Sequence, residues 1–201
     1  MKYEKDEISL EKGIEKEWII TNGIGGYSSS TIIGANTRKY HGLLVAPMMP
    51  PGSRHLILSK VDEAIIVDGK AYGLYTNVCK DNISDGYKHL KSFEKEYIPI
   101  FTYQVEDILI KKFICLEHGK NTVGIYYYIK NGEKAAKLTL APVVNFRGFH
   151  TTNTSEHFDV KQEIENNKVS LIIDNNSQHP IYTYVSEGRY IKHENDFFHN
   201  M

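Results

Sequence analysis

The sequence predicts an all-β protein, an antiparallel β-sandwich with short or no helices. Runs of β-branched and aromatic residues with alternating polarity recur along the 201 residues, and turn residues separate them. Asp-Gly and Asn-Gly dipeptides fall between two pairs of these runs, where a two-residue hairpin turn fits. Helical periodicity is confined to the first sixteen residues. Together these observations favour two large antiparallel sheets packed face to face.

The individual strands follow from the same signals. Residues 64–67 and 70–74 flank Asp68-Gly69 and are expected to form a hairpin. Residues 122–130 and 137–146 flank Asn131-Gly132 and predict a second, longer hairpin. Further strands are expected at residues 108–116, 169–173 and 181–185. The polar stretches 76–86 and 151–155 are expected to be loops.

Composition excludes several classes of protein. The formal charge is −1, with 24 Lys and Arg against 25 Asp and Glu and no basic stripe, which argues against nucleic-acid binding. No apolar run is long enough to span a membrane, and the N-terminus lacks the apolar core of a signal peptide. We therefore expect a cytoplasmic protein. The length suits one large β domain or two small ones, and we predict a single domain over residues 1–201.

Neither metal nor cofactor binding is predicted. The only cysteines, Cys79 and Cys115, form no CxxC or His/Cys ligand pattern, and we expect two reduced, buried thiols. Residues 81–86 resemble the start of a calcium loop. However, Ile83 and Ser92 occupy two of its ligand positions. The nine histidines are scattered without the HExxH spacing of a zinc site.

The most informative segment is a glycine-rich run followed by a group of polar and aromatic residues. Gly23, Gly25, Gly26 and Gly34 are four of the fifteen glycines, and residues 37–42 read TRKYHG. The dinucleotide fingerprint fails because its sixth position is Ser28, and no Gly-Lys-Ser/Thr follows, so a phosphate loop is excluded. A tight turn that uses positive φ at glycine remains.

The candidates for binding follow this turn in the sequence and are Arg38, Tyr40 and His41. If residues 38–41 are extended, Arg38 and Tyr40 share one face, and Lys39 and His41 share the other. Gly42 would let a backbone or a ligand approach closely. Arg38 and Tyr40 could position a sugar hydroxyl or pair with an acid. The alternative is an internal Arg–carboxylate pair that fixes the turn, and the sequence leaves both possibilities open.

No catalytic pair of carboxylates is predicted. Asp62 and Glu63 are adjacent and should point to opposite faces of a strand, so they could not cooperate in glycoside hydrolysis. Most of the acidic residues are expected to be solvated surface charges. The serines at residues 28–30 lack the G-x-S-x-G pattern of a nucleophile elbow.

Residues 22–29 (NGIGGYSS) and 34–45 (GANTRKYHGLLV) resemble the N-terminal domain of the archaeal and bacterial type of glycogen debranching enzyme. Residues 56–63 (LILSKVDE) are similar to the next strand of that family. Ser30 stands where relatives often have Gly, and Lys39 where they often have Arg. The resemblance is specific from about Trp18 to Glu63 and rests on topology alone beyond that point.

The resemblance implies a β-supersandwich that precedes a helical (α/α)6 toroid. In that family the toroid hydrolyses α-1,6-glucosidic branch points with its own carboxylates, so no catalytic residue is expected in this chain. The implied partners are an α-glucan and the helical catalytic domain of the same enzyme. Arg38, Tyr40 and His41 lie on the motif and are the candidates for these contacts, with Trp18 and Tyr27 as weaker candidates for stacking.

Two other functions stay open at this point. The chain could be a free-standing carbohydrate-binding module, or a purely structural scaffold whose motif faces the catalytic domain. If the helical toroid is missing, an apolar or aromatic docking face left exposed would favour self-association.

Overall fold

A computed structural model describes residues 1–79, 82–152, 159–174 and 176–192. Strands account for 59% of the structure and helices for 7%, which confirms an all-β fold. Contacts divide the chain into two compact units, residues 1–151 and a smaller unit that begins at Thr152. That the whole chain forms one domain stays a prediction.

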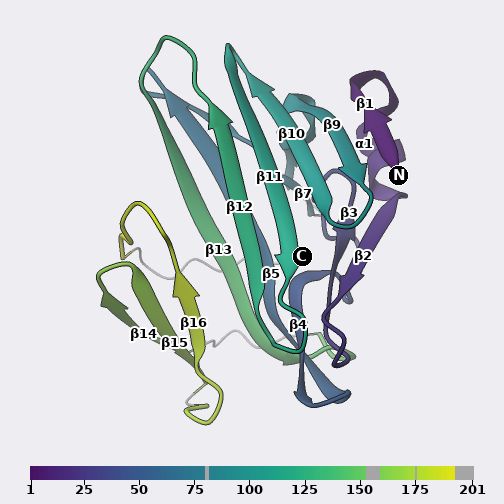
Figure 1. Cartoon of the computed structure of the whole chain (residues 1–201), viewed down its shortest axis with the longest axis vertical. Coiled ribbons are helices and arrows are strands. Elements are labelled where there is room, and N and C mark those ends of the chain that lie inside the picture. The colour runs from purple at the N-terminus through teal and green to yellow at the C-terminus, as the bar shows by residue number, and fades with distance from the viewer. Residues whose placement is uncertain (80–81, 153–158, 175, 193–201) are drawn as a thin grey trace. The chain divides into compact units, whose positions relative to one another are not determined.

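One sheet of the first unit has five strands and is antiparallel throughout (Figure 1). Its order is β1 (Lys2–Glu4), β9 (Leu90–Lys95), β10 (Pro99–Val105), β11 (Ile108–Leu116) and β12 (Val123–Lys130). The predicted strand at residues 108–116 is confirmed as β11. Its even-numbered residues from Ile108 to Ile114 are buried, because alternate side chains of a strand point to the same face of the sheet.

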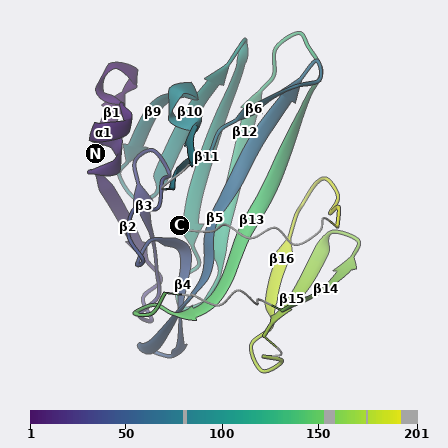
Figure 2. The same ribbon diagram turned by 180° about the vertical axis from the view of Figure 1, so that it is seen from behind.

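The other sheet has six antiparallel strands and lies behind the first in Figure 1 and in front of it in Figure 2. Its order is β13 (Ala136–Gly148), β5 (Gly52–Val67), β4 (Gly42–Met49), β3 (Tyr27–Thr31) and β2 (Glu17–Thr21), with β6 (Lys70–Gly73) also paired to β5. The turn between β5 and β6 uses Asp68 at φ 49° and Gly69 at φ 79°. Positive φ at both positions is what a two-residue hairpin turn needs, so this predicted hairpin is confirmed.

The second predicted hairpin is wrong. β12 and β13 belong to different sheets, because β12 pairs with β11 while β13 pairs with β5. The connection across Asn131-Gly132 therefore crosses from one sheet to the other. Asp107, in the turn between β10 and β11, holds it by accepting a hydrogen bond from the Glu133 amide at 3.0 Å. An Asn-Gly pair predicts a local turn, but it does not specify which strand the chain pairs with afterwards.

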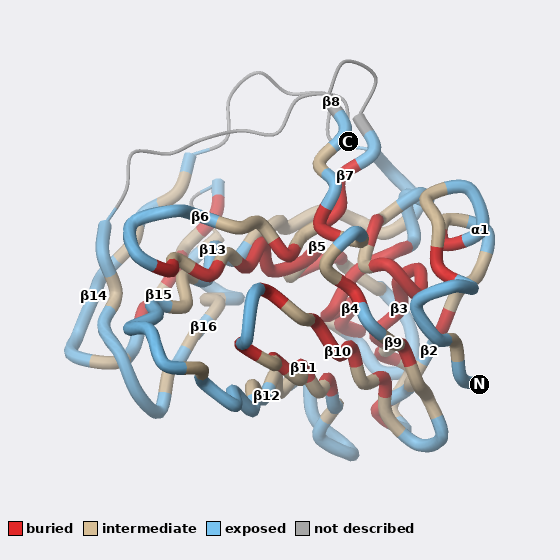
Figure 3. Tube along the Cα trace, turned by 90° about the horizontal axis from the view of Figure 1, so that it is seen from above, coloured by how far each residue is buried: buried red, intermediate tan, exposed pale blue. Residues whose placement is uncertain are grey.

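The core lies between the two sheets, where Figure 3 shows the buried residues gathered on facing strands. Phe93, Phe101 and Ile110 from the five-stranded sheet meet Ile65 and Val67 from β5, and all five are at most 2% exposed. Full burial of side chains of this size stabilises the fold by about 1.5–3 kcal/mol each. The sandwich is therefore held mainly by the apolar contacts of this layer.

Helical structure is short, as predicted. A 3-10 turn η1 (Lys5–Glu7) and one helix α1 (Leu10–Ile14) lie within the first sixteen residues, and Ser9 caps α1 by accepting the Lys12 amide at 3.2 Å. The loop predicted at residues 76–86 instead contains a small hairpin, β7 (Thr76–Cys79) with β8 (Asn82–Asp85), followed by η2 (Gly86–His89). Its polar residues hid these strands from a hydrophobic-pattern argument.

The second unit is a three-stranded antiparallel sheet with the order β14 (Val160–Glu165), β15 (Lys168–Ile173) and β16 (Ile181–Tyr184). Alternate residues of β15 (Val169, Leu171 and Ile173) are buried. The strands predicted at residues 169–173 and 181–185 are confirmed. Of the loop predicted at residues 151–155, positions 153–155 lie outside the described residues.

Candidate functional site

The glycine-rich turn is built around a buried asparagine. Asn22 is 0% exposed, and its side-chain oxygen accepts hydrogen bonds from the amides of Ile24 at 3.2 Å and Gly26 at 2.8 Å. Gly23 and Gly25 adopt φ values of 81° and 97°, which confirms the prediction of positive φ at glycine. A side chain would also be excluded by space, since an added Cβ at Gly25 would lie 2.4 Å from the Pro51 carbonyl oxygen. The side chain of Asn22 therefore holds the turn in shape from within.

The segment that carries Arg38, Tyr40 and His41 is a turn and not an extended strand. The His41 amide donates to the Arg38 carbonyl at 3.0 Å, so the alternation of faces expected for a strand does not apply. β4 begins only at Gly42, where an added Cβ would lie 2.2 Å from the Leu56 side chain. The close approach predicted for Gly42 is therefore present, and the approaching group is a core side chain.

His41 is a buried residue that holds this turn in shape. It is 4% exposed, and its Nδ1 accepts the Thr37 amide at 3.1 Å. Its Nε2 lies 3.3 Å from Glu17 Oε1. Since Nδ1 is an acceptor, the proton of the neutral ring sits on Nε2 and points at the Glu17 carboxylate. Burial lowers the pKa of His41, and the nearby Arg38 lowers it further, while Glu17 opposes both.

Arg38 forms the internal ion pair that the sequence left open as an alternative. Its Nε donates to Glu17 Oε1, the same carboxylate that faces His41. The Arg38 side chain nevertheless keeps 65% of its surface exposed, while that of Glu17 keeps 34%. One carboxylate on β2 thus holds both Arg38 and His41, and much of the Arg38 guanidinium still faces solvent.

Tyr40 is the exposed centre of an aromatic cluster. Its ring lies 5.4 Å from Phe149 and 5.9 Å from His150 between centroids, and its hydroxyl lies 3.4 Å from His150 Nδ1. Phe149 and His150 follow directly after β13, more than a hundred residues further along the chain. We call Arg38, Lys39, Tyr40, Phe149 and His150 the Tyr40 surface. Tyr40 is 37% exposed within it.

Two arginines and a lysine fix the Tyr40 surface to the rest of the first unit. Lys39 Nζ donates to the His150 carbonyl at 2.8 Å, and Arg147 donates in the opposite direction to the Lys39 carbonyl at 2.7 Å. Arg54 donates to the Gly25 carbonyl at 2.6 Å and lies 5.5 Å above the Phe149 ring. These bonds join the glycine turn, residues 37–41 and the end of β13 into one structure.

A scan against protein-family models matched residues 16–201 to the family described as glycogen debranching enzyme N terminal. The chain belongs to this family. The match includes the whole Tyr40 surface and extends well past the stretch on which the resemblance in the sequence was specific. A search of curated proteins and a search of solved structures each found no match.

The two weaker candidates of this debranching-enzyme N-terminal domain lie in different environments. Tyr27 is half-buried, and its hydroxyl donates to the Tyr40 carbonyl at 2.7 Å, so it holds the backbone of Tyr40 in place. Burial raises the pKa of Tyr27. Trp18 is only 3% exposed, donates from its indole to the Thr31 carbonyl at 3.1 Å and packs edge-on against Phe101. Trp18 is therefore a core residue and offers no surface for stacking.

Sequence reasoning missed half of the site. Phe149 was not singled out, His150 was counted among the scattered histidines, and neither Arg54 nor Arg147 was considered. A run of two phenylalanines, an arginine and a histidine at residues 146–150 was the available signal. However, nothing in a single sequence places that run beside residues 37–41.

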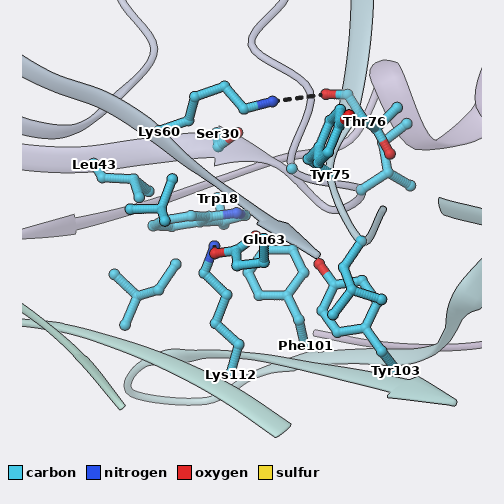
Figure 4. Close-up of a pocket in the computed structure, with 15 residues that line it drawn as sticks. Trp18, Ser30, Leu43, Lys60, Glu63, Tyr75, Thr76, Phe101, Tyr103 and Lys112 are labelled. Atoms are coloured by element: carbon cyan, nitrogen blue, oxygen red, sulfur yellow. Dashed lines mark hydrogen bonds and ion pairs between the residues drawn. The ribbon is translucent and has the colours of Figure 1, made fainter. Parts of the chain in front are cut away.

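The prediction of surface acids is wrong for Glu63, which is 2% exposed between the two sheets of the debranching-enzyme N-terminal domain. Its carboxylate pairs with Lys112 of β11 and accepts the Tyr127 hydroxyl at 2.7 Å (Figure 4 shows the pair). Burial raises the pKa values of Tyr127 and Tyr103 well above their ordinary range, and the Glu63 charge adds to the effect. The cavity beside this group is about 20 Å³, enough for one water molecule and not for a sugar.

Asp62 is buried in the same way on the opposite face of β5, as the strand geometry predicted. It pairs with Lys60 at 2.8 Å, and both residues are at most 8% exposed. Lys60 also donates to the Thr76 carbonyl at 3.1 Å and to Asn77 Oδ1 at 2.5 Å. Burial lowers the pKa of Lys60, and Asp62 opposes this. The pair fixes the β7–β8 hairpin onto the six-stranded sheet.

Among the described residues, no group of three His, Cys, Asp or Glu side chains is placed to hold a metal ion. No helix in this part of the chain is long and apolar enough to cross a membrane. Cys115 is a free thiol but is exposed, contrary to the prediction, because it points outward from β11. The side chain of Cys79 lies outside the described residues.

Proposed function

We propose that this chain is a non-catalytic domain of a glycogen debranching enzyme that helps to bind the α-glucan through the Tyr40 surface. The observation that carries the proposal is the half-open Tyr40 ring, held beside Phe149 and His150 in a fixed orientation. Rigid aromatic rings stack against the apolar faces of sugars at a low cost in conformational entropy.

The rim of the same surface supplies hydrogen-bond donors. The Tyr40 hydroxyl lies at the edge of the rings, 3.4 Å from His150 Nδ1, and the exposed side chain of Arg38, two residues before Tyr40, is oriented by Glu17. Sugar recognition needs both a ring to stack on and polar groups fixed at its edge. This combination favours a carbohydrate over an apolar protein partner. Packing against the helical catalytic domain stays a prediction.

The acidic residues of this site and of the core do not form a catalytic pair, so we assign catalysis to another domain. Hydrolysis with inversion or retention needs two carboxyl groups on opposite sides of the scissile bond. Asp62 and Glu63 are each committed to a buried lysine on opposite faces of β5. Glu17 is held by Arg38 and His41. These acids therefore serve the fold, and the proposed role of the chain is to hold substrate for a catalytic domain.

Affinity electrophoresis in a gel that contains glycogen tests the proposal. We expect the chain to be retarded and Tyr40→Ala to weaken binding about three- to tenfold, the value of one aromatic contact. Tyr97→Ala is the matched control, since Tyr97 is a tyrosine 82% exposed in the turn between β9 and β10. Equal losses from both variants would contradict the assignment of the site.

An unretarded wild-type chain would overturn glucan binding and favour a structural scaffold. Incubation with a branched limit dextrin supplies an independent check. We expect no release of glucose by the chain alone, and measurable release would contradict a non-catalytic role.

A further inference from the structure

The sandwich of the first unit is incomplete along one side. β12 and β13 are the last strands of their sheets: within the described part of the chain, β12 pairs only with β11 and β13 only with β5. Figure 3 shows β12 and β13 in the two different sheets, on the same side of the sandwich.

Side chains that face the core are exposed on this side. Leu140 of β13 pairs with Glu63 of β5, which points into the core, so Leu140 points the same way. It is nevertheless 44% exposed. On β12, Ile129 pairs with the fully buried Ile110 and is 38% exposed. The five-stranded sheet therefore ends before it covers the inner face of β13.

The outer edge of β12 also presents unpaired backbone groups. The Glu117 amide donates to the Thr122 carbonyl at 3.0 Å, which makes these residues a hydrogen-bonded pair at the start of the β11–β12 ladder. Hydrogen-bonded and non-hydrogen-bonded pairs alternate along an antiparallel ladder. The N–H and C=O groups of Ile125, Tyr127 and Ile129 consequently point away from β11, toward the free edge.

Nothing on β12 blocks a further strand. Residues 123–129 read VGIYYYI, with no charge and no proline, and their register with β11 is unbroken. The other edge strands of these two sheets are short or interrupted: β13 contains Pro142 and two register shifts, and β1, β6 and β2 have three, four and five residues. Edge strands normally carry charges, prolines or bulges that prevent pairing with another chain. A long, uncharged and regular edge strand is a site for strand addition.

We propose that β12 is a dimerisation edge, at which a second copy of this chain adds its own β12 antiparallel. The strand is self-complementary. The outward-pointing backbone groups belong to odd-numbered residues, so the two strands can bond with odd residues opposite odd residues.

One such register places Tyr126 of one copy opposite Tyr126 of the other. Ile125 then lies opposite Tyr127 of the second copy, and both side chains face the core side of the sheet. Lys130 then lies opposite the neutral Thr122, so the two lysines do not repel each other. The added strand covers exposed inner-face side chains such as Leu140. The apolar gain and the new backbone hydrogen bonds thus favour the same arrangement.

Light scattering coupled to size-exclusion chromatography of the full chain tests the proposal. We expect a mass of twice the 23.0 kDa of one chain, falling to one chain on dilution. Ile129→Lys places a charge on the inner side of the free edge and should abolish the dimer. Ile19→Lys is the matched control, because Ile19 is 55% exposed on the short edge strand β2 and should leave the dimer intact.

Amide hydrogen exchange on the wild-type chain keeps the test decisive if Ile129→Lys fails to fold. We expect the amides of Ile125, Tyr127 and Ile129 to exchange more slowly at high protein concentration than at low concentration, while the Ile19 amide does not change. A monomer at every concentration would overturn the proposal. So would a dimer that survives Ile129→Lys with these three amides unprotected, since its interface would then lie elsewhere. The inference does not depend on glucan binding.

Discussion

His41 Nε2 lies 3.3 Å from Glu17 Oε1, and the Arg38 guanidinium bonds the same carboxylate oxygen. A residue on β2 therefore fixes both ends of the 38–41 turn. Without Glu17, Arg38 would be free to move and His41 would lose the acceptor for its Nε2 proton. Tyr40 lies between these two residues in the chain, so Glu17 contributes to its orientation together with the hydrogen bond from Tyr27.

The stability of the fold should depend on the protonation of His41. Its pKa is lower in the folded chain than the ordinary value of 6.5, so the neutral ring is favoured by folding. The stabilising contribution of the neutral His41 ring is then complete above the ordinary pKa of 6.5. It is lost as the pH falls through the lower pKa of His41 in the folded chain. Urea denaturation at about pH 7.5 and about pH 5.5 should show lower stability at the acidic value, and His41→Gln should reduce the difference. An unchanged difference would assign it to another group.

Removing one partner of the buried Lys112–Glu63 pair should be strongly destabilising. Lys112→Met leaves the Glu63 charge buried and uncompensated, and we expect a loss of about 3–5 kcal/mol in the free energy of unfolding. The double variant Lys112→Met, Glu63→Leu removes both charges and should recover most of that loss. Guanidinium denaturation of the wild type, both single variants and the double variant measures the coupling. Additive effects would mean that the two side chains do not interact.

Two glycines with similar backbone conformations separate the effect of space from that of φ. Gly25→Ala should cost clearly more than Gly69→Ala, because an added Cβ at Gly25 meets the Pro51 carbonyl whereas no described atom lies within 4 Å of one at Gly69. The φ cost common to both is about 1–2 kcal/mol. Thermal unfolding followed by circular dichroism compares them. Equal losses would show that the contact with Pro51 relaxes.

Tyr27→Phe tests whether the support beneath Tyr40 matters for function. The variant loses the hydrogen bond from the Tyr27 hydroxyl to the Tyr40 carbonyl, and the unfolding free energy should fall by about 1 kcal/mol. Retardation in glycogen should decrease, but less than for Tyr40→Ala, because the ring itself is still present. A loss of stability without any change in retardation would separate the turn from the binding surface.

Much of the fold followed from local patterns, and much of the site did not. The alternation from Ile108 to Ile114 and the Asp68-Gly69 turn each contain their own physical explanation, so a single sequence was enough for them. The path of the chain after Asn131-Gly132 could not be predicted from local patterns. It depends on which strand β13 meets, and that contact lies far away in the sequence.

The contacts of the site could not be predicted from the sequence for a related reason. The conformation of residues 38–41 could not be read from their own sequence, because the turn is imposed by Glu17 and by the bond from Thr37 to His41. Burial of Asp62 and Glu63 depends on Lys60 and Lys112 reaching them. Which lysine pairs with a buried acid is decided by the folded structure and cannot be read from the neighbouring sequence.

The pairing of β5 with β13 has a consequence for synthesis of the chain. β5 ends at Val67, yet its neighbour on one side begins only at Ala136. During translation one flank of β5 therefore waits until residues 68–135, about a third of the chain, have been made before its native partner follows. Contacts of such long range fold slowly, and a newly made chain must keep this apolar strand from misassociating until β13 arrives.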